Sequence, residues 1–321
     1  MMMRNTPFAE KFRDRLRLPL IAAPMLRVSG PDIVVACSRA GVIGAFPTAN
    51  AQSPSELDEW LTGIESQLKD DPGAGAPICP NLIIRHATMV EDLKCLVKHK
   101  VEVVITSVGS PAAVIKPLHD IGCFVLADVA SVRHAEKAIE AGADGLILLT
   151  AGAGGNTGWV NPFAFVRAVR KMFDGVVVLA GGVSDGQSLY AAQVLGCDLA
   201  YMGTGFIVTK ESMASDGYRD MLVASSLDDV MLTRAFTGLQ VNMLRPSIAK
   251  AGIDPDRLDE EVSAERAKEQ FGGGKASSGK PRRWVDLWSA GHSVSGVNEV
   301  TDVASLVGRL EKEYRAARSG S

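Results

Sequence analysis

A loop with four glycines in ten positions, TAGAGGNTGW at residues 150–159, directly follows the apolar run GLILL. Glycine-rich loops after a strand often lie against an anion or a flat ring. This loop contains no acid, base or thiol, and Asn156 is the amide that it offers to a ligand. An amide donates and accepts hydrogen bonds but cannot take up a proton at working pH. We therefore expect Asn156 to face a pocket as a donor, with capping of its own turn as the alternative.

Two further pairs of small residues end the apolar runs at 176–182 and 199–204. VVVLAGG ends in Gly181 and Gly182, and LAYMGT ends in Gly203 and Thr204. Glycines at such positions let backbone N–H groups approach a phosphate closely. The two pairs predict a phosphate-binding site, and the alternative is that the glycines only make tight turns.

Other apolar runs also end in residues that could line the same pocket. Ala23, Pro24 and Met25 form a small apolar group that suits a flat ring, while Asn81 and Asp128 add polar groups. A flat ring with a phosphate tail would fit these residues together with the two glycine pairs. Tyr201 lies within its apolar run and is interpreted as a packing residue.

Eight short apolar runs alternate with stretches of helical period and must position these residues. The runs cover 19–25, 42–46, 77–84, 101–107, 123–129, 145–150, 176–182 and 199–204, and helices are predicted at 31–41, 54–68, 87–99, 131–143 and 185–196. Strands that are apolar throughout indicate a parallel sheet covered by helices. Eight units predict a closed (β/α)8 TIM barrel, with an open doubly wound sheet as the alternative. In such barrels the active site forms at the C-terminal ends of the strands.

After the eighth run the pattern changes to a helical C-terminal elaboration. Helical stretches are predicted at 218–226 and 232–236, and the low-complexity segment FGGGKASSGKPRR (271–283) predicts a mobile surface lid. The tail at 300–319 has helical period and predicts a closing helix that packs back on the barrel. We expect a single domain over 1–321, with the barrel at about 19–210 and the elaboration at about 211–321.

The composition restricts the class of protein. Hydrophobic residues make up 46% and charged residues 22% of the chain, which is typical of a globular protein. The net charge is −3 with both signs mixed along the chain, which predicts no basic face for binding nucleic acid. No apolar run is long enough to span a membrane. The five cysteines lack CxxC spacing and the five histidines lack metal-ligand spacing, so we expect free thiols, no metal and a cytoplasmic location. A small-molecule substrate is expected, and the sequence leaves a homodimer open.

These residues together resemble the FMN-dependent nitronate monooxygenase (2-nitropropane dioxygenase) family. The resemblance rests on PLIAAPM, Asn81, SVRHAEKAIEAGADGLI, AGAGGNTG, VLAGGVSDG, AYMGTGFIVTKES, FTGLQVNMLR and WSAGHSV. It implies FMN with its phosphate on Gly181, Gly182, Gly203 and Thr204, its ring over Ala23, Pro24 and Met25, and Asn81 hydrogen-bonded to the ring. The expected cofactor-binding set also includes Asp128, Gly154, Gly155 and Met202.

Two positions depart from the pattern that the resemblance implies. Many family members have a histidine, the expected base for neutral nitroalkanes, where this chain has Asn156. Similar relatives carry a lysine near the flavin where this chain has Asp128, so Asp128 is expected either to turn away from the ring or to bind substrate. His292, in WSAGHSV, is the candidate that could replace the missing base.

The resemblance implies a flavoenzyme that oxidises a nitronate or a similar small carbanion with O2, in which Asn156 orients an anion. The first alternative is an NAD(P)H-dependent flavin reductase or dehydrogenase that acts on an enoyl or acyl-CoA thioester or a quinone. The second is a phosphate-binding barrel without flavin, either a lyase, an isomerase or a binding protein.

Overall fold

A computed structural model of the protein describes residues 4–69, 75–272 and 279–320. Eight parallel strands close into a barrel in the order β1-β2-β3-β4-β5-β6-β8-β9. The barrel strands are β1 (Leu20–Ala22), β2 (Ile43–Pro47), β3 (Ile78–Ile83), β4 (Val103–Ser107), β5 (Phe124–Val129), β6 (Gly145–Leu149), β8 (Val176–Ala180) and β9 (Leu199–Met202). Each corresponds to one of the eight predicted runs, so the predicted TIM barrel is confirmed and the open sheet is wrong.

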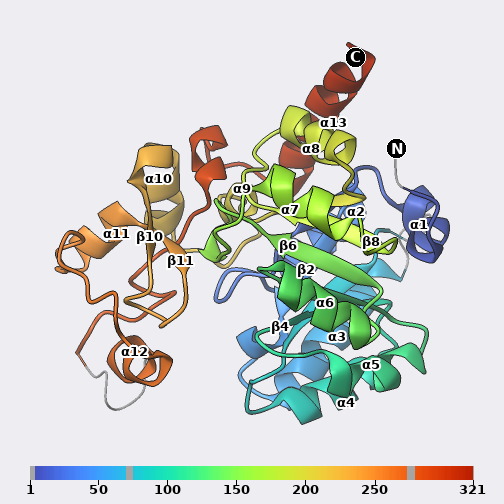
Figure 1. The fold of residues 1–321 in the computed structure, drawn as a ribbon, viewed down its shortest axis with the longest axis horizontal. Helices are drawn as coiled ribbons and strands as arrows, with labels where there is room; N and C mark the ends of the chain where they lie inside the picture. Colours follow the sequence, from blue (N-terminus) through green and yellow to red (C-terminus); the bar gives the residue numbers. More distant parts are fainter. Residues whose placement is uncertain (1–3, 70–74, 273–278, 321) are drawn as a thin grey trace.

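Helices surround the barrel, and three more lie in a second part of the molecule (Figure 1). They are α1 (Pro7–Phe12), α2 (Pro31–Ala40), α3 (Pro54–Leu68), α4 (Met89–Lys98), α5 (Ala112–His119), α6 (Val132–Glu140), α7 (Pro162–Val169), α8 (Gly186–Leu195), α9 (Thr204–Ile207), α10 (Asp216–Ala224), α11 (Arg245–Lys250), α12 (Ala264–Phe271) and α13 (Val303–Ser319). None of the described helices is long and apolar enough to cross a membrane.

The barrel interior is filled by apolar side chains and closed at one end by α1. Phe8 and Phe12 of α1 are buried against Phe124 of β5, with ring centroids 5.4 and 5.7 Å from it. Edge-to-face packing of this kind is favourable because the edge of one ring faces the negative face of the other. The N-terminal ends of the strands are therefore sealed, and the opposite end is left to bind ligands.

The closing helix predicted for the tail is present as α13, which packs against α8 and α2. The Gly186 N–H donates to Glu313 at 2.9 Å, and Arg17 forms an ion pair with Glu311. Leu306, Leu310 and neighbouring apolar residues of α13 belong to the core between the barrel and its helices. The C-terminal helix thus covers one side of the barrel and shields it from solvent.

Residues beyond the barrel form a lobe on one side of it, which Figure 1 shows in yellow to orange. The lobe contains a three-stranded sheet of β10 (Val230–Thr233), β11 (Val241–Leu244) and β7 (Gly155–Asn156). The helix predicted at 232–236 is wrong, because Leu232 and Thr233 pair with β11. Their side chains alternate as in a strand, with Leu232 exposed and Thr233 buried.

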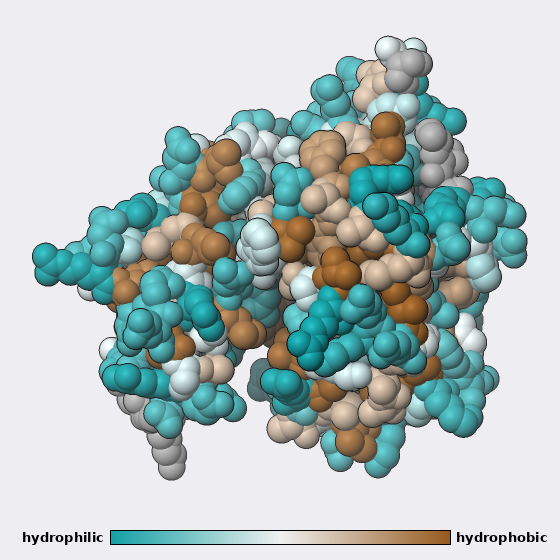
Figure 2. Space-filling model, viewed as in Figure 1, coloured by the Kyte–Doolittle hydropathy of each residue, from teal (hydrophilic) through white to brown (hydrophobic). Residues whose placement is uncertain are grey.

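The helix predicted at 218–226 is confirmed as part of α10. Of the segment 271–283 predicted as a mobile lid, residues 273–278 lie outside the described residues. Figure 2 shows a hollow between the lobe and the barrel.

Candidate active site

The floor of the site follows from the alternation of side chains along the barrel strands. On β5, Phe124 and Leu126 point into the barrel core, and Asp128, two residues further, lines a cavity at its open end. On β9 the same spacing leads from Leu199 in the core to Tyr201 in the cavity. The last interior layer of the barrel is therefore partly polar, although the layers beneath it are apolar.

Two neighbouring strands contribute a hydrogen-bonded pair to this floor. The Asn81 amide of β3 lies 3.1 Å from the Ser107 hydroxyl of β4, and both side chains are buried. Each residue is thereby held in one orientation, as buried polar groups require. Asn81 thus reaches the cavity as predicted, and Ser107 is an additional lining residue.

The cavity occupies about 1220 Å³, including the part that is open to solvent. Twelve of the predicted site residues line it: Ala23, Pro24, Met25, Asn81, Asp128, Gly154, Gly155, Asn156, Gly181, Gly182, Gly203 and Thr204. They come from the ends of six different barrel strands, so the closure of the barrel brings them together.

The predicted phosphate site is built from backbone. Gly181 and Gly182 have φ values of 123° and 77°, which favour glycine. A Cβ on Gly181 would come within 2.5 Å of the Thr150 hydroxyl, whereas the space beside Gly182 is open. Among the described residues, the N–H groups of Gly182 and Gly203 donate to no other group. Free N–H groups at adjacent strand ends are suited to an anion.

The glycine-rich loop joins the barrel to the lobe. Gly155 and Asn156 form β7, which pairs with β11, and the Asn242 amide donates to the Ala153 carbonyl at 2.7 Å. Asn156 is exposed at the mouth of the cavity and lines it. The loop predicted from sequence is therefore partly a strand, and its pairing holds Asn156 at the mouth.

Aromatic residues of the lobe form a wall that the sequence did not indicate. Tyr218 of α10 stacks on Trp288 with ring centroids 5.0 Å apart and an interplanar angle of 12°, and its hydroxyl donates to the Ser289 carbonyl. Trp284 lines the cavity beside them. Tyr201, interpreted as packing, also lines the cavity, and the spacing of two from Leu199 was the signal that could have identified it.

Two predicted site residues do not line the cavity. The Met202 side chain points into the core between the barrel and its helices, because it follows the inward-facing Tyr201, and its carbonyl accepts from the Ala23 N–H. His292 is exposed, and its ring lies against Gly152. The geometry therefore does not support His292 as a base.

Left-handed backbone is concentrated around the cavity. Four described residues other than glycine have positive φ: Arg27, Lys100, Val108 and Trp284. Val108 and Trp284 line the cavity, and Arg27 lies between two lining residues. Valine rarely adopts this conformation because its branched side chain clashes with the backbone, and such strain is typical of functional sites.

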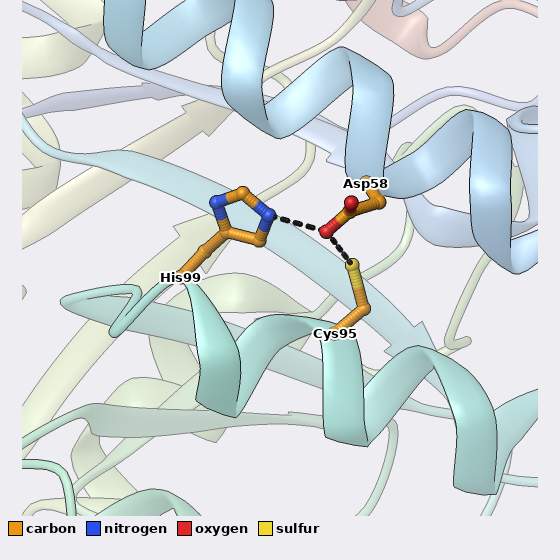
Figure 3. Close-up of side chains that lie close together, drawn as sticks. All are labelled: Asp58, Cys95 and His99. Atoms are coloured by element: carbon orange, nitrogen blue, oxygen red, sulfur yellow. Dashed lines mark hydrogen bonds and ion pairs between the residues drawn. The ribbon is translucent and has the colours of Figure 1, made fainter.

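Among the described residues, one group combines side chains that could bind a metal, and it lies outside the cavity. Asp58 of α3 faces Cys95 of α4 and His99, which directly follows α4 (Figure 3), with 2.7 Å between its Oδ1 and the His99 Nε2. Hydrogen bonds from Lys98 and then His99 lower the pKa of Asp58 to about 2, and burial raises that of the Cys95 thiol to about 11. A neutral thiol is a poor ligand, so the group is best described as a hydrogen-bonded contact between the two helices, to which the ion pair of Lys98 with Asp58 adds.

A closed parallel barrel with glycine-lined strand ends and a polar floor at its C-terminal end is typical of ligand-binding TIM-barrel enzymes. A family model described as nitronate monooxygenase matches residues 75–310. The nitronate monooxygenase of Paraburkholderia phytofirmans is 25% identical over 344 residues, covering 92% of each chain. A protein of Rhodococcus jostii named (3aS,4S,5R,7aS)-5-hydroxy-7a-methyl-1-oxo-octahydro-1H-indene-4-carboxyl-CoA dehydrogenase is 27% identical over 269 residues, covering 84% of this chain and 73% of that one.

The structure of FabK from Thermotoga maritima superposes with a TM-score of 0.82 at 25% identity, covering 99% of this chain and 98% of that one. Since the family model spans most of the chain, the protein belongs to the nitronate monooxygenase family. It is a flavin-dependent oxidoreductase.

Proposed function

We propose that the flavin is FMN and that the enzyme oxidises nitronates or similar small carbanions with O2. The observation that carries the proposal is the set of titratable groups in the cavity lining. Among the described residues these are Asp128, Tyr201 and Tyr218, with no histidine, lysine or glutamate. Burial raises the pKa of Tyr218 to about 12 and that of Tyr201 well above its ordinary value, so neither is a base at neutral pH.

The residues present fit FMN. The free N–H groups of Gly182 and Gly203 and the open space beside Gly182 suit its phosphate. Thr204 accepts from the Gly291 N–H at 3.0 Å and keeps its own O–H as a donor. The buried Asp128 Oδ1, which has no partner among the described residues, leaves a polar group for the ring system. When bound, FMN supplies the two-electron oxidation and the reaction with O2.

The chain orients an anion and keeps water away from it. Asn156 stands at the mouth, where its amide can donate to the oxygens of a nitronate, while Asp128 lies at the floor. An amide donor stabilises negative charge without removing a proton. Tyr218 and Trp288 cover the cavity from the lobe and exclude solvent. Because no base stands beside Asn156 at the mouth, we expect the substrate to arrive already deprotonated.

The test is to record the visible spectrum of the purified protein and to mix it without oxygen with a nitronate and with the neutral nitroalkane. We expect bleaching of the flavin by the nitronate and little by the neutral form. Equal rates with both forms would overturn the proposal that the enzyme lacks a base at the mouth.

A second candidate function is an NAD(P)H-dependent flavin reductase or dehydrogenase acting on an enoyl or acyl-CoA thioester or a quinone. The aromatic wall favours it, because Trp288 and Trp284 offer more apolar surface than a small nitronate needs. Hydride transfer depends on alignment and needs no base at Asn156. Rapid bleaching by NADH or NADPH without oxygen would support this function, and no bleaching would exclude it.

A further inference from the structure

Asp128 places a carboxyl group at the floor of the cavity. Its Oδ1 is buried and accepts no hydrogen bond from the residues that the structure describes. Buried polar atoms nearly always have a partner, and an exception calls for an explanation. Because Asp128 lines the cavity, the missing partner can come from a ligand.

No cation of the described part of the chain faces this carboxyl group. The titratable groups near it are Cys79 on β3 and Tyr201 on β9, and burial, more than Asp128 itself, keeps both uncharged. The described cavity lining contains no lysine, arginine or histidine. An unpaired carboxylate is unfavourable in such surroundings, and burial raises the pKa of Asp128 to about 7.

A protonated carboxyl group needs an acceptor rather than a donor. The polar neighbours Asn81 and Ser107 are hydrogen-bonded to each other. The ring of a flavin carries carbonyl oxygens and unprotonated nitrogens, which are acceptors. The chemistry of the ring therefore complements a neutral acid better than it complements a carboxylate, which would repel these atoms.

We propose that Asp128 carries its proton in the flavin-loaded enzyme and donates a hydrogen bond to an acceptor atom of the FMN ring. The inference rests on the proposed function, because it takes FMN as the ligand. Asp128 is thus neither turned away from the cavity nor kept as a charged substrate-binding group. The binding of FMN therefore depends on the protonation of the Asp128 carboxyl group.

The consequence is a defined pH dependence of FMN binding. If FMN binds the protonated form better, its affinity falls as pH rises above about 7, by up to about tenfold per pH unit. Asp128→Asn keeps a donor of the same shape but has no proton to lose, so its affinity should not show this fall. Asp128→Leu removes the donor and should bind more weakly at every pH, by about tenfold near pH 6.

The experiment measures the dissociation constant of FMN by fluorescence quenching, on flavin-free wild type and both variants, from about pH 6 to about pH 9. The FMN phosphate also titrates, and the ratio of wild type to Asp128→Asn removes its contribution. Infrared difference spectroscopy of the flavin-loaded wild type gives a second readout, independent of any variant. We expect a carboxylic-acid C=O band that shifts when FMN binds.

A constant ratio across this pH range, or the absence of the carboxylic-acid band, would overturn the inference while leaving FMN binding intact. A constant ratio with activity that rises through pH 7 would instead assign Asp128 as a base for the substrate. Absence of FMN binding to the wild type at every pH would overturn the proposed function, and this inference with it.

Discussion

Gly154 and Gly291 touch through their backbones, such that a Cβ on Gly154 would lie 2.7 Å from the Gly291 nitrogen. This contact joins the glycine-rich loop after β6 to the segment that contains Trp288 and Ser289. The same segment is tied to the barrel by the hydrogen bond from Gly291 to Thr204. The mouth and the predicted phosphate site are therefore held together at one place.

Replacing Gly291 by alanine should disrupt the contact between the glycine-rich loop and the segment that contains Trp288. Its Cβ would meet the Gly152 carbonyl oxygen at 2.7 Å and the Gly154 nitrogen at 3.0 Å, and neither backbone atom can move without shifting the loop. We expect a loss of about 1–3 kcal/mol in the free energy of unfolding, together with weaker flavin binding. Denaturant unfolding and a flavin titration would measure the two effects.

Gly63→Ala is the control, because nothing lies within 4 Å of that position in α3 and its helical backbone suits alanine. The control should gain up to about 1 kcal/mol. Unchanged stability and flavin affinity in Gly291→Ala would contradict the close contact.

Gly182→Ala tests the phosphate site. The residue has φ of 77°, lines the cavity and has open space where a Cβ would stand. We expect the strain to cost about 1 kcal/mol of stability and the added methyl group to weaken FMN binding by about tenfold. Gly252→Ala carries the same strain, with φ of 79° and open space, but lies outside the cavity lining. If both variants bind FMN equally, Gly182 is not part of the phosphate site.

Much of the fold could be predicted because barrel strands are buried on both sides and therefore apolar throughout. The positions of Gly181 and Gly203 at the site could be predicted because the C-terminal ends of all strands in a closed parallel barrel lie at the same end of the barrel. The sheet of β7, β10 and β11 could not, since its strands have two to four residues and pair with segments far along the chain. Trp288 was missed for the same reason, because its place in the cavity depends on how the lobe packs.

Val108→Asn should stabilise the flavin-free protein. Val108 has φ of 54°, and asparagine tolerates this backbone conformation far better than valine does. Relief of about 2 kcal/mol of strain outweighs about 1 kcal/mol of lost burial, since the side chain is 40% exposed. Val132→Asn, at a 39% exposed valine without positive φ, is the matched control and should show no gain. Thermal unfolding that ranks the two variants in the opposite order would refute the strain.

The stability of the flavin-free protein should decrease with pH through Asp128. Burial raises its pKa to about 7 in the folded chain, so the folded state holds a proton that the unfolded chain releases near pH 4. The contribution is complete below about pH 4 and is lost as pH rises to about 7, by no more than about 4 kcal/mol. Denaturant unfolding of wild type and Asp128→Asn at several pH values measures it, and parallel profiles would show that folding leaves the pKa of Asp128 near its ordinary value.

If the proposed function holds, Asn156→His should add activity on neutral nitroalkanes. The position lies at the mouth, is held by pairing with Val241 of β11, and is exposed enough to accept a larger side chain. A neutral imidazole there can remove a proton from a neutral nitroalkane, and a positioned base contributes about 10²-fold or more. We expect kcat/KM for neutral nitroalkanes to rise by at least tenfold, with a pH dependence set by histidine, while nitronate turnover changes little. Asn156→Ala should lower nitronate turnover without adding activity on the neutral form. An Asn156→His enzyme that is no better with neutral nitroalkanes would mean that the reacting carbon does not lie within reach of this loop.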